Sequence, residues 1–578
     1  MLRVPTDRKD LINFANETVA ICRASAGTRS AYYRVLNAIT ETGRIDGSAR
    51  SLINLLYAHL DRLSAHLYSP TDLRFSIDFE NLYPPDITAR GDVAADVLTR
   101  DWERNNTDML FGQGVFESLK YGSCLLKQWT EQEGEESTNV ARSSLVMPWQ
   151  FGVYREDIND LSRQEAMCET ITLSLPEVWR RIHHLPNADY LFRQVKSNSK
   201  KGLADDEYNS FSHSVLSTSP LNTSDVGMTR MQPGGIVQLA ADTGGGPPGT
   251  QLTADMVKMH ELWVKDEDDY TTIQIIEPDI LIAPRMRKSN LLISGAKSML
   301  HPYTLIQPNR AWGDFWGRSE LLDLISPQEL LSIWAEDTKR LYGLQIDKII
   351  GFAGDDGITE ERYGQMRGAG FINASPGATM TDLTPQMPTQ ALQMLEYMVK
   401  IINMIGGFDN ILSGQGEPGV RAGVHADTMM KTASPRLRDR SLLVERQCAA
   451  AGDLRLSLME AKDPHNYWTT GDSVEKIEAT KFTLADIPED RRVTVDSHSS
   501  SPIFADDHQQ LIAFGLKANL VDPHSGIEEL PFPHKKKLLQ RLTKREEAQA
   551  AQLAALQKQD PEAFAKVMEK AAGGKGHH

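Results

Sequence analysis

The chain has 578 residues, 40% of them hydrophobic, and a formal net charge of −16. This length allows several packed regions, so a single compact domain is not expected. The acidic balance argues against a protein whose task is tight DNA binding, because that affinity depends on neutralising phosphates with Lys and Arg. No run approaches the roughly 18 consecutive apolar residues of a membrane span, and no signal-peptide pattern is present, so we expect a soluble intracellular protein.

The residue types that build catalytic centres form no complete motif. The four cysteines lack a CxxC pair, which favours free thiols; they are Cys22, Cys124, Cys168 and Cys448. His260-Glu261 begins like a zinc-protease motif, but Val264 stands where the second histidine is needed. Acidic pairs or clusters occur at Asp355-Asp356 and at Asp266, Asp268 and Asp269. A weak metal site is one hypothesis for them, and turn capping with solvation is the other.

Hydrophobic periodicity predicts a mainly helical N-terminal region that leads into sheet. Helices are predicted at 31–39, 49–67 and 92–122, and extended segments at 72–79, 123–129 and 146–154. Residues 196–256 are rich in Ser, Gly, Asn, Thr and Pro, so we predict an exposed, partly disordered insertion. β-rich sequence follows from 256 to 284. A last alternating strand, 491–496, is predicted to return to the same sheet.

A long helix is predicted from 319 to 342. Its apolar residues recur at the spacing of one helical face, and they are Leu321, Leu322, Ile325, Leu330, Ile333, Trp334 and Leu341. Ser326, Pro327 and Glu329 form a capping-box start inside this segment. We therefore predict a kink there, because a proline ring clashes with the preceding turn. An ordinary amphipathic core helix is the alternative interpretation.

A second helix is predicted to begin at Thr389 as N-cap and to stop at Gly406 and Gly407. About 45 residues separate the two helices, whereas a turn in a helical bundle needs roughly two to eight. This segment contains strand candidates at 348–352 and 370–373, with a short helix at 359–366 between them. The pattern predicts a helical hairpin with a small αβ subdomain at its tip.

A glycine-punctuated loop is predicted after the hairpin, at 408–423. Glycine permits backbone angles closed to other residues, so we expect this loop to bend or move; its glycines and charges are Gly414, Gly416, Glu417, Gly419, Arg421 and Gly423. A phosphate-binding loop is excluded, because no Gly-Lys-Ser/Thr ends it. A long helix is then predicted over 424–461, interrupted at Ser434-Pro435.

Beyond Ser501 the sequence predicts helices at 506–518, 533–556 and 561–572. The middle one carries a basic cluster beside an apolar side, and its main members are Lys535, Lys536, Lys537 and Arg541. A solvated amphipathic helix and a contact with DNA are the two interpretations of this cluster.

The succession of helix, αβ excursion, helix and glycine-rich loop resembles the portal proteins of tailed bacteriophages. The sequence that carries the resemblance runs from WGRSELLDLISPQELLSIWAEDTKRLYG through TQALQMLEYMVKIINMIGG to FDNILSGQGEPGVRAG. The resemblance implies an α+β, predominantly helical portal fold. Its parts would be a wing at 1–318 with the insertion, stem helices at 319–344 and 389–407, a clip at 345–388, a tunnel loop at 408–423, a long kinked helix with a returning wing strand at 424–500, and a crown at 501–578.

The resemblance also implies a function and partners. Portal subunits form a ring, typically a dodecamer, at one capsid vertex, and the ring conducts the genome during packaging and ejection. The implied partners are further copies of the chain, the terminase large subunit, head-completion, neck or tail proteins, the major capsid and scaffold proteins, and double-stranded DNA without sequence preference. No enzymatic activity, catalytic residue, cofactor, metal or membrane is implied, and the expected location is the virion, reached from the host cytoplasm.

Residue roles follow from the resemblance by position. The clip would dock the motor through Asp355, Asp356, Glu360, Glu361 and Arg362. In the tunnel loop, Arg421 would contact phosphate, or would instead pair with Glu417 or with a neighbouring subunit. In the crown, the basic cluster would contact packaged DNA. Two alternative functions stay open: a nucleic-acid-processing enzyme with an unrecognised acidic metal site, and another oligomeric phage connector, which the length of the chain disfavours.

Overall fold

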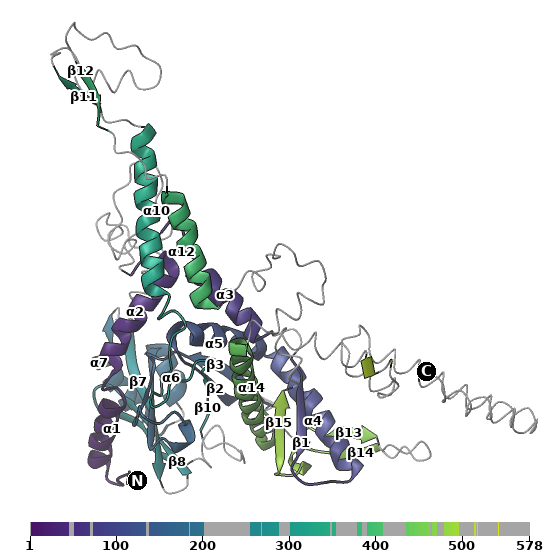
Figure 1. The fold of residues 1–578 in the computed structure, drawn as a ribbon. Helices are drawn as coiled ribbons and strands as arrows, with labels where there is room; N and C mark the ends of the chain where they lie inside the picture. Colours follow the sequence, from purple (N-terminus) through teal and green to yellow (C-terminus); the bar gives the residue numbers. More distant parts are fainter. Residues whose placement is uncertain are drawn as a thin grey trace, which may run out of the picture. The chain divides into compact units, whose positions relative to one another are not determined.

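The computed structural model describes the chain in segments (Figure 1). They are 2–45, 51–69, 73–133, 138–183, 185–201, 255–266, 269–287, 301–346, 350–353, 379–383, 390–407, 435–462, 465–470, 479–495 and the single residues 514, 515, 517 and 542. The chain divides into two compact units, 1–500 and 501–578, and every helix and strand named below belongs to the first. Within the described segments, no helix combines the length and apolar character that crossing a membrane requires.

The largest sheet has six antiparallel strands in the order β4-β5-β7-β8-β9, with the short β6 paired to β7. Their bounds are β4 Phe151–Val153, β5 Ala166–Ser174, β6 Lys200–Lys201, β7 Asp255–Asp266, β8 Asp269–Ile276 and β9 Ile280–Arg287. Alternate residues of β7 face opposite sides of the sheet, as strand geometry requires. Leu262 and Val264 join one hydrophobic cluster and Trp263 joins another. The prediction of β structure between 256 and 284 is confirmed.

A second, three-stranded sheet packs on the face that carries Trp263. Its order is β10-β2-β3, with bounds β2 Cys124–Glu133, β3 Thr138–Val146 and β10 Tyr303–Ile306. The ring of Tyr303 lies 4.9 Å from that of Phe151 and 6.2 Å from that of Trp263, measured between centroids. The predicted strand at 123–129 is confirmed. The predicted strand at 146–154 is wrong over 147–150, where the amide of Gln150 donates to the carbonyl of Met147 in a turn.

Helices cover the outer faces of the large sheet. Helix α1 (Arg8–Cys22) packs its buried residues against β5, β7 and β8, while α6 (Leu175–Ile182) and α7 (Ala188–Asn198) cover one end of the opposite face. Helix α6 begins with a capping box formed by Ser174 and Glu177. None of these three helices was predicted from the sequence. Of the predicted insertion at 196–256, residues 202–254 lie outside the described residues.

The predicted helix at 92–122 is wrong as one element. Two helices occupy this region, α4 (Pro85–Arg104) and α5 (Thr107–Tyr121). The helical conformation is interrupted between them at Asn106, whose φ of 51° is left-handed and therefore ends a right-handed helix. The predictions at 31–39 and 49–67 correspond to α2 (Ala26–Thr42) and α3 (Leu56–Leu67), and residues 51–55 precede the second helix instead of belonging to it.

Helix α14 (Pro435–Lys462) is largely enclosed by α3, β2, β3, β10 and β15. Its Arg455 is fully buried and pairs with Asp101 of α4 at 2.7 Å. The helix is described from Pro435 onward, and the predicted part at 424–434, with Ser434 of the predicted interruption, lies outside the described residues.

Two ribbons complete this region, β1 (Phe75–Phe79) with β15 (Arg491–Val495) and β13 (Tyr467–Thr470) with β14 (Ala479–Phe482). The strand predicted at 491–496 is confirmed as a strand, but its predicted return to the large sheet is wrong. It pairs with β1 in antiparallel register, Val493 opposite Ile77. Phe75 and Ile77 of β1 are buried, and Phe75 packs against Gly452 of α14 and Trp102 of α4, so the ribbon forms a separate layer.

Candidate functional site

The helical hairpin predicted from the sequence is formed by α10 (Ile325–Ile346) and α12 (Ala391–Gly406), which lie side by side (Figure 1). The first helix begins at Ile325, so its predicted start at 319 and its predicted internal kink are wrong. Residues 320–324 form turns, in which the amide of Leu324 donates to the carbonyl of Leu321. Pro327 therefore lies in the first helical turn, where a missing N–H disrupts no helical hydrogen bond.

The second helix ends where the sequence predicts. Gly407 closes it with a left-handed φ of 75° and donates its amide to the carbonyl of Met404. Its N-cap is Gln390, one residue after the predicted Thr389.

An antiparallel ribbon lies in the segment between the two helices. Strand β11 (Ile350–Ala353) confirms the first strand candidate, and it pairs with β12 (Thr379–Asp382), which sequence reasoning missed. The predicted strand at 370–373 and the predicted helix at 359–366 lie outside the described residues. A β-ribbon therefore lies between the two helices of the hairpin in the chain.

The first turns of α10 are fastened to the segment that follows α2. Gln328 donates to the carbonyl of Ile53 at 2.8 Å and accepts from the amide of Leu55 at 3.2 Å. Ser332 donates to the carbonyl of Gly43 at 2.7 Å. Gln328 and Ser332 are fully buried, so these bonds are shielded from water. They fix the direction in which the hairpin leaves its base.

A buried carboxylate lies at the same base. Glu320, in the turns that precede α10, accepts from Arg440 of α14 at 2.7 Å and from Asn309 at 2.9 Å, and His59 of α3 lies 3.9 Å away. Burial raises the pKa of Glu320, but His59, Arg440 and Asn309 outweigh burial and lower the pKa to about 2. A Cβ added at Gly406 would overlap the ring of His59, so the end of α12 lies in close contact with this histidine. This cluster joins α3, α12 and α14.

Helix α12 carries apolar residues on two neighbouring faces. One face is buried and contains Met398, which is 6% exposed, and Ile402, which is 1% exposed. The other contains Met394, Tyr397 and Met404, which are 47%, 58% and 70% exposed. Their spacing, with half-buried Ile401 between them, follows one stripe of a helix. We call Met394, Tyr397, Ile401 and Met404 the α12 stripe.

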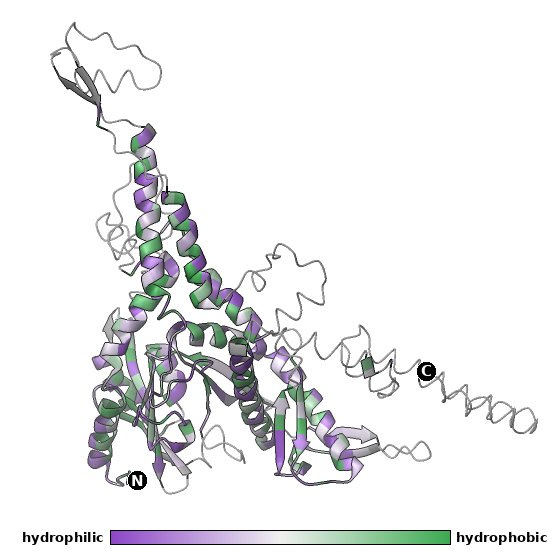
Figure 2. Cartoon of the chain, viewed as in Figure 1, coloured by the Kyte–Doolittle hydropathy of each residue, from purple (hydrophilic) through white to green (hydrophobic). Residues whose placement is uncertain are grey.

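Helix α10 shows the same imbalance. Leu331 and Ala335 are buried, whereas Leu330 and Ile333 are 37% and 42% exposed. The predicted apolar face of this helix contains Leu330 and Ile333 and is thus not the face that packs on the base. Figure 2 shows hydrophobic residues distributed along both helices. A groove of about 270 Å³ lies between them, lined by Trp334, Asp337, Thr338, Leu341, Gln390, Ala391 and Met394.

The residues to which the resemblance assigns roles lie outside the described residues. These are Asp355, Asp356, Glu360, Glu361 and Arg362 of the predicted clip, Gly414, Gly416, Glu417, Gly419, Arg421 and Gly423 of the predicted tunnel loop, and Lys535, Lys536, Lys537 and Arg541 of the predicted crown. The structure therefore does not test the roles predicted for these residues. The hairpin, its ribbon and much of the predicted wing are the parts of the predicted assembly that the structure describes.

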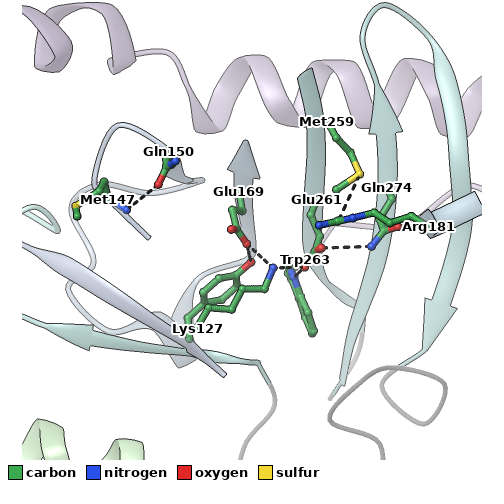
Figure 3. Close-up of polar contacts among 10 residues, drawn as sticks. Lys127, Met147, Gln150, Glu169, Arg181, Met259, Glu261, Trp263 and Gln274 are labelled. Carbon is green, nitrogen blue, oxygen red and sulfur yellow. Dashed lines mark hydrogen bonds and ion pairs between the residues drawn. The ribbon is translucent and has the colours of Figure 1, made fainter. Parts of the chain in front are cut away.

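A second polar cluster lies between the two sheets (Figure 3). The ammonium of Lys127 on β2 lies 2.5 Å from Glu169 on β5 and 3.1 Å from Glu261 on β7. Tyr303 donates to Glu169 at 2.6 Å and Trp263 donates to Glu261 at 3.0 Å. Burial lowers the pKa of Lys127, but the two carboxylates outweigh burial and raise it. Sequence reasoning missed this cluster, because its members come from strands far apart in the chain.

The burial of the Lys127 cluster indicates a role in stabilising the fold and not in catalysis. Lys127, Glu169 and Glu261 are at most 10% exposed at their side chains, so a substrate has no access to them. The histidine of the incomplete zinc-protease motif is also engaged: His260 contacts the hydroxyl of Thr170 at 3.0 Å and Glu277 at 2.9 Å. The cluster cross-links the sheets.

Metal-binding arrangements are missing from the part of the chain that the structure describes, since no three His, Cys, Asp or Glu residues come together there to hold an ion. Asp266 and Asp269 lie opposite each other at the ends of β7 and β8, and Asp268, Asp355 and Asp356 lie outside the described residues. The four cysteines are buried and free, which confirms the prediction of free thiols.

Comparison with known proteins adds no assignment to this geometry. No model of a known protein family matches the sequence, and no curated protein matches it.

Proposed function

We propose that this chain is a portal-type subunit, which assembles with copies of itself into a ring around a DNA channel at the capsid vertex of a tailed phage or prophage. The ring would conduct the genome during packaging and ejection. The segment at the tip of the hairpin would dock the terminase large subunit and later the neck or tail proteins. The proposal assigns no catalytic step, cofactor or metal to the chain.

The observation that carries the proposal is the α12 stripe. A soluble helix normally turns one apolar face to the core and polar residues to water. Helix α12 instead has a buried apolar face and a second apolar face that is about half exposed. Burying the exposed half of a methionine or tyrosine side chain contributes on the order of 1 kcal/mol. A neighbouring copy that covers the stripe therefore gains several such contributions.

The hairpin also offers two different surfaces, as a ring requires. A closed ring is built from heterologous contacts, in which one patch of a subunit meets a different patch of the next. The α12 stripe is one patch, and the exposed Leu330 and Ile333 of α10 are on the other helix. The chain's net charge of −16 supports a conduit over a tight DNA binder, because acidic walls do not hold a polyanion.

The direct test is the mass of the purified full-length protein in ordinary buffer, measured by mass photometry. Electron micrographs viewed down the ring axis give the shape of the particle. We expect a ring with an axial opening wide enough for duplex DNA. Tyr397→Glu combined with Met404→Glu should give smaller species, because it places charge in the proposed contact. Glu396→Gln, an exposed change elsewhere on α12, should leave the ring intact.

Two outcomes would contradict the proposal. One is a stable, monodisperse monomer under conditions that permit assembly. The other is a ring whose mass is unchanged by the Tyr397→Glu and Met404→Glu substitutions, which would show that copies meet elsewhere and would remove the α12 stripe as support for the proposal. Magnesium-dependent nuclease activity of the purified chain would instead favour the enzyme hypothesis.

A further inference from the structure

A groove of about 470 Å³ runs between helix α14 and strand β15. Its walls are one face of the helix and the whole strand, with the residues Leu442, Glu445, Arg446, Ala449, Ala450 and Asp453 on α14 and 491–495 on β15. The helical segment 442–453 and the strand 491–495 each span about 17 Å, so the two walls match in length. The volume is within the range of roughly 300–1,000 Å³ that ligand sites occupy.

The groove lies along the free edge of β15. Every residue of the strand lines it and no residue of β1 does, whereas a groove over the face of the ribbon would be lined by alternate residues of both strands. Among the described strands, β15 pairs only with β1. An open strand edge presents backbone donors and acceptors that a further strand can use.

The register of the ribbon identifies these backbone groups. The amide of Glu80 donates to the carbonyl of Asp490, and the amide of Phe75 donates away from the ribbon to Thr99. Antiparallel pairs alternate between hydrogen-bonded and non-hydrogen-bonded, so the pairs that contain 491, 493 and 495 are non-hydrogen-bonded. The backbone amides and carbonyls of Arg491, Val493 and Val495 therefore point into the groove.

The charges at the groove favour a negative occupant. Arg446 and Arg492 are exposed, and neither has an ion-pair or hydrogen-bond partner among the residues that the structure describes. Arg491 is already paired with Glu460 at 2.5 Å, and the carboxylates Glu445 and Asp453 have partners of their own. Among the described charged residues of the groove, the side chains left without a partner are thus the two arginines, although the chain as a whole is acidic.

We infer that this groove is a docking site for an extended acidic segment of a partner protein, which adds to β15 as a third strand. Strand addition beside a helix is a recurring mode of peptide recognition, in which main-chain hydrogen bonds supply affinity and flanking side chains supply specificity. Here Val493 and Val495 would supply the main-chain bonds, Ala449 and Ala450 leave room for side chains, and Arg446 and Arg492 select acidic residues. The inference is independent of the ring proposed above.

The probe is a short fluorescent peptide of alternating valine and glutamate, added to the full-length protein and followed by fluorescence anisotropy. We expect saturable binding that weakens with salt, and protection of the amides of Val493 and Val495 from hydrogen exchange. The same peptide with lysine in place of glutamate should not bind. A version methylated at alternate backbone nitrogens should also fail, because it lacks the donors that strand addition needs.

Variants separate the surface from general effects. Arg446→Glu combined with Arg492→Glu should weaken the acidic peptide roughly tenfold or more, because two attractive contacts become repulsive. Arg62→Glu, the same change on an exposed position of α3, should leave binding unchanged. Ala450→Trp should block the groove, and unchanged protection of the α14 amides would show that this variant still folds.

Three results would overturn the inference: no binding of the acidic peptide, equal binding of the basic peptide, or binding indifferent to the arginine and Ala450 substitutions. A fourth is a change in the mass of the purified protein caused by Arg446→Glu and Arg492→Glu, together with no peptide binding. That combination would assign the groove to a contact between copies of this chain.

Discussion

Replacing Lys127 with methionine should destabilise the region between the two sheets more than any substitution of an exposed lysine. The ammonium of Lys127 lies between Glu169 and Glu261, at 2.5 Å and 3.1 Å. Methionine has a similar length but no charge, so Lys127→Met leaves two buried carboxylates facing each other. Removing one partner from a buried ion pair costs about 3–5 kcal/mol, and the mutual repulsion of the carboxylates places the expected loss at the upper end.

The loss should depend on pH in a defined direction. In the native protein, Lys127 and other neighbours lower the pKa of Glu261 against the effect of burial, and the pKa of Lys127 is raised. The stability from Glu261 is therefore complete above its usual pKa of 4.5 and lost as pH falls through its lowered value. The stability from Lys127 is complete below its usual pKa of 10.5 and lost as pH rises through its raised value. Without Lys127, burial raises the pKa of Glu261, so the variant should approach the wild type as the solution is acidified from neutral pH.

Hydrogen exchange of the β2, β5 and β7 amides measures the opening free energy where the cluster lies. The control is Lys127→Met with Glu169→Gln and Glu261→Gln, which removes all three charges and should recover most of the loss, since uncharged buried groups carry a smaller desolvation cost. Wild-type protection in Lys127→Met, or a loss that does not change with pH, would refute the assignment of this cluster as a charge-compensated cross-link.

Gly406→Ala should lower the urea concentration at the unfolding midpoint and reduce the free energy of unfolding by about 1–3 kcal/mol, because the new methyl group would overlap His59. Gly343→Ala on α10, where nothing lies within 4 Å, should be neutral or slightly stabilising. Glu320→Gln should destabilise the base of the hairpin by leaving Arg440 without its buried partner, and the deficit should shrink as pH falls from 4.5 towards 2, because the pKa of Glu320 is about 2. Deleting 414–419 should preserve assembly and impair DNA packaging or retention; normal genome content in such particles would remove the proposed role of the loop.

Local sequence signals predicted the hairpin well because helix starts and stops are local. The glycine pair marks the end of α12 as predicted, and Pro327 lies in the first turn of α10, although the predicted start at 319 and the predicted kink are wrong. The break between α4 and α5 was missed for the opposite reason. Asn105 and Asn106 interrupt no hydrophobic period, and neither is Gly or Pro, so only the left-handed φ of Asn106 reveals the boundary.

Local sequence patterns could not predict which distant segments pair with each other. The strand at 491–495 has the expected alternation, but its partner is Phe75–Phe79, and a period of two does not specify which edge a strand joins. The Lys127 cluster needs β2, β5 and β7 to meet, which depends on the packing of two sheets. The exposure of the α12 stripe was equally hidden, because an apolar periodic helix reads the same whether its second face meets the core or a neighbour.

The base and the outer surface of the hairpin have different roles in the proposed assembly: the base orders the hairpin, and the outer surface supplies the contact. Ordering a helix at the moment of association costs conformational entropy and weakens binding. In this chain the buried hydrogen bonds of Gln328 and Ser332, and the ion pair of Glu320 with Arg440, fix the base of the hairpin within the single subunit. The α12 stripe is then presented on a helix whose direction is already set. In the proposed ring, contact between copies would add hydrophobic burial without first ordering the hairpin, so polar contacts at the base should strengthen assembly without touching the neighbouring subunit.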